Sequence, residues 1–126
     1  MIDFKNKLIF KLHKVNIDKK EQALQDQLLD GEEVIGAYQT MRDYVVFTNM
    51  RIISVNVQGV TGKKKDFTSM PYAKINCFSI ETSGVLDLDS ELELYIAGVD
   101  EVIHFEFFGN CDIKEIGKNI AKYALR

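Results

Sequence analysis

The stretch FTNMRIISVNVQG, residues 47–59, contains the end of one strand-like run, a turn, a second run and a glycine. The runs at residues 43–48 and 51–57 are rich in Val and Ile, which favour strands. Asn49 and Met50 between them supply a two-residue turn. The stretch therefore predicts a β-hairpin.

The second run of this hairpin carries an arginine among apolar residues. Because side chains alternate across a strand, Arg51 shares one face with Ile53, Val55 and Val57, and Ser54 and Asn56 share the other with Ile52. We expect Arg51 to pair with a carboxylate such as Asp43 on the partner strand. The other interpretation is a contact with a protein or an anionic ligand at the rim.

Extended segments continue on both sides of the hairpin. They are expected at residues 34–41, 63–72, 75–82, 91–97 and 102–108. Gly36 suggests a bulge and Pro71 a strand end. The segment at 91–97 alternates most clearly, with Leu92, Leu94 and Ile96 facing inward. Seven short strands predict an antiparallel β-barrel or sandwich.

Helical patterns flank these strands. Residues 1–17 place apolar residues at helical spacing beside Lys7, Lys11 and Lys14, and Asp18 with Glu21 suggests the cap of a second helix over 18–29, with Leu24 and Leu28 buried. Asp112 and Glu115 cap a C-terminal amphipathic helix, in which Gly117 allows close approach to the sheet. We expect a helical extension over 1–30 and the main unit over 31–126, a single domain overall.

The amino-acid composition argues against several classes of function. The chain has 126 residues, 46% hydrophobic and 28% charged, with a net charge of -3. A negative balance argues against nonspecific nucleic-acid binding. Apolar runs fall short of the ~20 residues of a membrane span, and the lysine-rich start is a poor signal peptide. Cys77 and Cys111 are expected to be reduced thiols in a cytosolic protein.

Motifs for catalysis or metal binding are weak. Residues 87–93 carry alternating carboxylates, but Leu92 and Gly98 occupy the positions where a calcium loop needs Gly and Glu. His13 and His104 share no zinc-ligand spacing with the two cysteines. Residues 59–63 lack the spacing of a phosphate-binding loop. We expect no enzyme activity, no metal and no cofactor.

Three blocks occur in one order: FTNxRII at 47–53, QGxTGKK at 58–64 and DLDxELEL at 87–94. Together they resemble the bacterial pleckstrin-homology (PH-like) domain family of small stand-alone proteins, over roughly residues 30–125. The resemblance implies a PH-like β-barrel with a C-terminal helix in a bacterial cytoplasmic protein without known enzyme activity. It also implies cyclic homo-oligomers, with a pentamer as one candidate ring, whose strands meet at a hydrophilic surface that engages an unidentified protein.

Polar residues on and beside the predicted strands are the candidates for that partner or oligomer surface. They are Asn49, Arg51, Ser54, Asn56, Lys63, Lys64, Thr68, Ser69 and Asn76. Met50 replaces the basic residue that the resemblance leads us to expect.

The alternative function is peripheral binding of anionic lipids through Lys7, Lys11, Lys14 and the run from Lys63 to Lys65. Eukaryotic inositide-binding PH domains cluster cations in the loop that here is 40–43, which contains only Arg42. The lysine run is also explained as a solvated strand start that protects a sheet edge.

Overall fold

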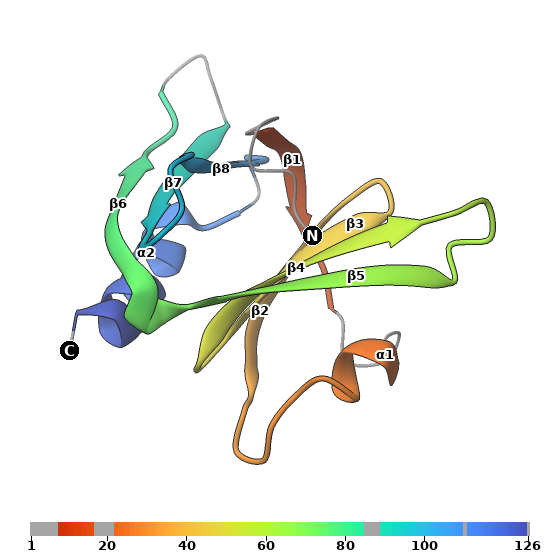
Figure 1. Cartoon of the computed structure of the whole chain (residues 1–126). Coiled ribbons are helices and arrows are strands. Elements are labelled where there is room, and N and C mark those ends of the chain that lie inside the picture. Colours follow the sequence, from red (N-terminus) through yellow and green to blue (C-terminus); the bar gives the residue numbers. More distant parts are fainter. Residues whose placement is uncertain (1–7, 17–21, 85–88, 110, 126) are drawn as a thin grey trace.

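The computed structural model describes residues 8–16, 22–84, 89–109 and 111–125. Within these residues, eight strands form one curled sheet, and α2 contacts η1, β6 and β7 (Figure 1). The strands are β1 (Leu8–Lys14), β2 (Val34–Thr40), β3 (Asp43–Thr48), β4 (Arg51–Gln58), β5 (Lys64–Pro71), β6 (Ile75–Glu81), β7 (Ser90–Ile96) and β8 (Ile103–Phe107). The helices are α1 (Gln22–Gln25), the 3-10 turn η1 (Tyr72–Lys74) and α2 (Ile113–Ala124).

The sheet consists of two antiparallel meanders joined by the first strand. Its order is β5-β4-β3-β2-β1-β8-β7-β6. β1 pairs with β2 in an antiparallel manner and with β8 in a parallel manner, which places Leu8 beside His104. The first and last strands in this order, β5 and β6, therefore form the two edges of the sheet.

The helix predicted over residues 1–17 is wrong for the described part, because residues 8–14 form β1. Residues 1–7 lie outside the described residues. The apolar residues here suit either period, and pairing with β2 and β8 satisfies the backbone of the strand. Leu12 is fully buried in the core. The same strand corrects two further predictions. The described sheet has eight strands instead of seven, and the pairing of β1 with β8 is parallel.

The helix predicted over 18–29 is also shorter in the structure. Of the described residues 22–29, only Gln22–Gln25 is helical, and the predicted cap Asp18 lies outside the described residues. The backbone then tightens into three-residue turns, with Gln27 N–H donating to Leu24 O and Leu28 N–H to Gln25 O. The predicted burial of Leu24 is nevertheless confirmed, and Leu28 is partly buried against the same cluster.

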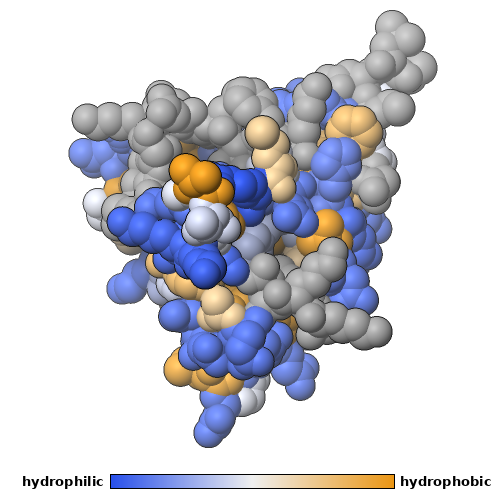
Figure 2. All heavy atoms as spheres, turned by 90° about the vertical axis from the view of Figure 1, so that its right-hand side faces the viewer, coloured by the Kyte–Doolittle hydropathy of each residue, from blue (hydrophilic) through white to orange (hydrophobic). Residues whose placement is uncertain are grey.

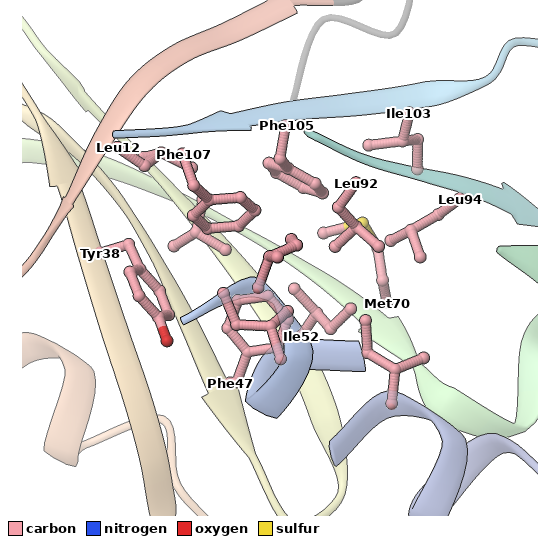
Figure 3. Close-up of a cluster of buried hydrophobic side chains, with 14 of the residues drawn as sticks. Leu12, Tyr38, Phe47, Ile52, Met70, Leu92, Leu94, Ile103, Phe105 and Phe107 are labelled. Atoms are coloured by element: carbon pink, nitrogen blue, oxygen red, sulfur yellow. The ribbon is translucent and has the colours of Figure 1, made fainter. Parts of the chain in front are cut away.

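The larger of two apolar clusters fills the inside of the curled sheet. Side chains from β1 to β5, β7 and β8 meet there, including Leu12, Tyr38, Phe47, Ile52, Met70, Leu92 and Phe105 (Figure 3). Ile113, Ile116 and Ile120 of α2 join them. The predicted inward positions Leu92, Leu94 and Ile96 are confirmed as buried.

The smaller cluster covers the outer face of the β2–β4 region. It consists of Leu24, Ala37, Tyr44, Val46, Ile53 and Val55. Strands β3 and β4 are therefore buried on both faces, which explains why residues 44–47 form a continuous apolar run instead of an alternating one.

Three local predictions, on the cap of α2, on its close approach to the sheet and on the bulge in β2, are confirmed. The Asp112 carboxylate accepts a hydrogen bond from Glu115 N–H at 3.2 Å, which caps α2. A Cβ atom added at Gly117 would lie 3.0 Å from Ile80 Cδ1, so this glycine allows α2 to approach β6 closely. The register of β2 and β3 shifts between Val34 and Gly36, as expected for a bulge.

Candidate functional site

Arg51, the most conspicuous residue of the hairpin, makes a two-pronged ion pair with Glu32. Its Nε donates to Glu32 Oε2 and its Nη2 to Glu32 Oε1, both at 2.9 Å. The Glu32 side chain is 0% exposed and that of Arg51 is 20% exposed. The predicted pairing of Arg51 with Asp43 is wrong, because Asp43 lies on the opposite face of the hairpin and accepts from Val57 N–H.

The surrounding polar groups complete the coordination of Glu32. Thr48 Oγ1 donates to Glu32 Oε2 at 2.7 Å, and Leu29 N–H donates to Oε1 at 3.1 Å. Burial raises the pKa of Glu32, but the hydrogen bonds from Arg51, Thr48 and Leu29 outweigh it and hold this pKa below its ordinary value. The carboxylate is therefore charged at neutral pH.

Asn49 ties the same turn to the segment that precedes β2. Its Oδ1 accepts from Glu33 N–H at 2.8 Å, and its Nδ2 donates to Gly31 O at 3.0 Å. The remaining donors of Arg51 reach Ser69 Oγ and Gln27 O. Because this guanidinium already bonds three protein partners, the arrangement favours a structural role over an anion site. Glu32, Thr48, Asn49 and Arg51 thus form a hydrogen-bonded clasp between the β3–β4 turn and the segment before β2.

Ser54, Asn56 and Thr68 lie on the inner face of β4 and β5. Ser54 is 2% exposed and stands opposite Thr68, which is also buried. Asn56 Nδ2 lies 3.5 Å from Asp43 Oδ2, and its buried Oδ1 lacks a partner among the described residues. Ser54 and Thr68 therefore cannot contact a partner in the folded monomer.

The exposed candidates lie along the sheet edges. Lys63 and Lys64 are exposed where the β4–β5 loop enters β5, and Ser69 is exposed farther along that strand. Asn76 is exposed at the start of β6. Among the coloured residues of the face in Figure 2, which views the right-hand side of Figure 1, hydrophilic residues predominate and apolar ones are scattered. The structure brings some of the nine predicted residues together, as with Arg51 and Ser69 or Ser54 and Thr68, but the set as a whole does not converge on one pocket.

Open hollows occur on the surface of the described residues. One, of about 370 Å³, is lined by the tip of the β3–β4 turn, η1 and the end of α2. Tyr72 and Tyr123 stack there with ring centroids 5.3 Å apart, and Tyr72 Oη donates to Thr48 O. The pKa of Tyr72 is raised, chiefly by burial, so the phenol stays neutral.

The second hollow, of about 510 Å³, lies beside the start of α2 and includes Cys111. Burial raises the pKa of this thiol, which favours the unreactive protonated form. Across residues 8–16, 22–84, 89–109 and 111–125, no group of three His, Cys, Asp or Glu side chains is arranged to hold a metal ion. No helix among them is long and apolar enough to cross a membrane.

Comparison with known proteins places this architecture. The family model described as bacterial PH domain matches residues 3–124. The chain belongs to the bacterial PH domain family. The matched region begins earlier than the roughly 30–125 suggested by the sequence blocks and therefore includes β1. This strand lies between β2 and β8 and is an integral part of the sheet.

Solved relatives share the fold of this bacterial PH domain. A DUF1696 family protein with a pleckstrin-homology domain from Shewanella loihica is 39% identical, with a TM-score of 0.79 over 92% of this chain and 99% of that chain. A pleckstrin homology domain from Shewanella amazonensis is 43% identical, with a TM-score of 0.68 over 89% and 90% of the two chains.

Two curated relatives come from Bacillus subtilis. The uncharacterized protein YjqA is 49% identical over 80 residues, which span 64% of each chain. The uncharacterized protein YozO is 30% identical over 115 residues, covering 91% of this chain and 96% of its own. Both relatives are named as uncharacterized proteins, so the family assignment rests on the family model.

The outer face of β6, β7 and β8 contains an acidic group that the sequence did not reveal. Glu81, Glu91 and Glu106 stand in one row across the three strands, and Glu93 stands beside His104 in the next. His104 Nε2 lies 3.6 Å from Glu91 and its Nδ1 3.6 Å from Glu93. Alternating Glu91 and Glu93 were visible in the sequence, but only the strand register shows that the rows coincide.

The carboxylates of this outer face affect one another. The pKa of Glu91 is raised, first by burial and then by a hydrogen bond to Glu81, with Glu106 adding to the effect and His104 opposing it. The row is therefore an accumulation of negative charge on a sheet face.

Proposed function

We propose that this bacterial PH domain is a non-enzymatic interaction module of the bacterial cytoplasm, which forms a cyclic homo-oligomer and presents a polar surface to a protein partner. The observation that carries the proposal is the position of the exposed candidate residues. Lys63, Lys64 and Ser69 line the edge strand β5. Exposed polar side chains along this strand give a neighbouring protomer or a protein partner groups to contact, as at the polar rim of known interfaces.

The clasp around Arg51 supports this interpretation indirectly. Glu32 and Asn49 fix the β3–β4 turn to the segment before β2, so the end of β5 is held in place by Arg51 through Ser69. A rigid edge loses little conformational entropy when it associates.

Light scattering coupled to size-exclusion chromatography tests the oligomer. At micromolar concentration we expect one species whose mass is an integer multiple, greater than one, of the monomer mass. Lys64→Glu should shift it toward smaller species, whereas Lys118→Glu, the same change at an exposed site on α2, should not. A monomer at all concentrations would refute the ring, and equal behaviour of both variants would refute the β5 surface.

Peripheral binding of anionic lipids is the second candidate, because Lys63 and Lys64 are exposed. The amphipathic helix that first suggested it is replaced by β1 over residues 8–14. Each cation near an anionic surface contributes about 1 kcal/mol. Cosedimentation with phosphatidylserine vesicles at low salt should therefore be weak and should disappear in Lys63→Ser/Lys64→Ser. Absence of cosedimentation at the lowest salt would exclude this function.

A further inference from the structure

The two edge strands of the sheet differ in how they are protected. β5, with the sequence KKDFTSMP, contains two lysines at one end and a proline at the other. Lysine and proline are the residues by which proteins discourage pairing at a sheet edge. β6, with the sequence INCFSIE, contains neither. Its irregularity is confined to the shift between Ile75 and Cys77, after which five residues pair regularly with β7.

The β6 edge is accessible along this regular part. Cys77, Ser79, Ile80 and Glu81 are all exposed, and Ile80 retains 37% of its surface although it packs on Gly117. A strand added here would find apolar contact at Phe78 and Ile80 on one face. On the other face it would lie beside Ser79 and Glu81.

The negative charge on β6 and β7 determines which partner strand can bind at the β6 edge. Glu81 would be the direct neighbour of the added strand, about 5 Å away between Cβ atoms. Glu91 follows in the same row and Glu93 in the row of Ser79. Lysine or arginine side chains on the outer face of an added strand would relieve the accumulated negative charge of this face.

We propose that the free edge of β6 binds an extended segment of a partner protein in which basic residues alternate with apolar ones. The basic residues lie over Glu81, Glu91 and Glu93, and the apolar residues pack beside Phe78 and Ile80. The inference names a partner class and a docking strand for the protein-binding half of the proposed function, and it does not depend on the ring.

The probe is a synthetic heptapeptide of alternating lysine and valine, titrated into the 126-residue protein at low salt. We expect amide chemical-shift changes concentrated at residues 77–81 and loss of binding as salt rises. Absence of binding, or changes centred on another strand, would overturn the proposal.

Two matched pairs separate edge pairing from general charge attraction. Glu81→Lys should weaken peptide binding by about five-fold or more, whereas Asp100→Lys, an equal charge change in the exposed turn between β7 and β8, should have little effect. Alternate N–H groups of a paired peptide point toward β6, and the others point away from it. Methylation of the nitrogens that point toward β6 should therefore abolish binding, whereas methylation of the others should spare it. Equal behaviour within either pair would refute strand addition.

The oligomeric state, measured in the same samples, distinguishes this inference from the ring. If the peptide binds and the mass of the assembly is unchanged, the edge serves a different protein, as proposed. If the peptide or Glu81→Lys dissociates the assembly, the β6 edge lies between copies of this chain, and the inference fails although the ring stands.

Discussion

The two halves of the sheet use the same backbone geometry but differ in what covers their outer face. In the β2–β5 half, β3 is buried continuously from Tyr44 to Thr48. In the β6–β8 half, burial alternates, with Leu92 and Leu94 inside and Glu91 and Glu93 partly exposed. The pattern of buried residues along a strand therefore depends on what covers the sheet as much as on the position of the strand in the sheet.

The covering layer of the first half comes from the segment around α1. Leu24 packs on the outer face of β2, β3 and β4, and Glu32 attaches the end of the segment to Arg51. On the second half, the corresponding face carries Glu81, Glu91 and His104. Substitutions on the two outer faces should therefore have unequal effects.

Leu24→Ala should give the largest effect. Removing a fully buried leucine leaves a cavity and should lower the free energy of unfolding by about 3 kcal/mol. Leu29→Ala is the control, because Leu29 is 62% exposed in the same segment. Urea denaturation measures both. A change below about 1 kcal/mol for Leu24→Ala would show that the segment adds little to the stability of the outer face.

Arg51→Met should come next, at about 2 kcal/mol, because it leaves the carboxylate of Glu32 buried without its ion-pair partner. Arg42→Met, which removes a single exposed hydrogen bond to Gly59 O, should cost about 0.5 kcal/mol. If the clasp is a coupled pair, Glu32→Leu/Arg51→Met should be more stable than the sum of the two single changes predicts. Additive effects in this cycle would contradict the coupling.

The hairpin that opened the sequence was predicted well because its signals are local. Asn49 and Met50 set the turn, and the strand at 43–48 has the predicted bounds. The alternation of Leu92, Leu94 and Ile96 gave β7 and its buried face. The cap at Asp112 and the close approach at Gly117 likewise depend on neighbours in sequence or on one face of one helix.

Features that depend on distant partners were missed. β1 pairs with β8, nearly the whole chain away, and its residues alone suit a helix or a strand. Glu32 becomes the partner of Arg51 only when the segment before β2 folds over the hairpin. Ser54 and Thr68 have the composition of surface residues but lie on the covered inner face. Polarity alone could not distinguish these faces.

Acid should weaken the clasp in a defined pH range. Because the folded-state pKa of Glu32 lies below its unfolded value, its contribution to stability is present above the unfolded pKa, about 4.3, and is lost as pH falls through the folded pKa. The stability difference between wild type and Glu32→Gln should therefore shrink below about pH 4. Glu33→Gln, an exposed neighbour, is the control. Parallel pH profiles for wild type and Glu32→Gln would refute the pKa assignment.

On the β6–β8 half of the sheet, Glu91→Gln should give the smallest effect, of opposite sign. The raised pKa of Glu91 means that its ionised form is less favourable in the folded state, because of burial and then of Glu81. This penalty exists above the folded pKa and vanishes as pH falls below the unfolded value. At neutral pH, removing the charge should stabilise the protein by up to about 0.5 kcal/mol, because the site is partly exposed and solvent screens the repulsion from the neighbouring carboxylates. Thermal unfolding at pH 7 and pH 4 measures the effect. Destabilisation at pH 7 would contradict the unfavourable charge assigned to Glu91 in the folded state.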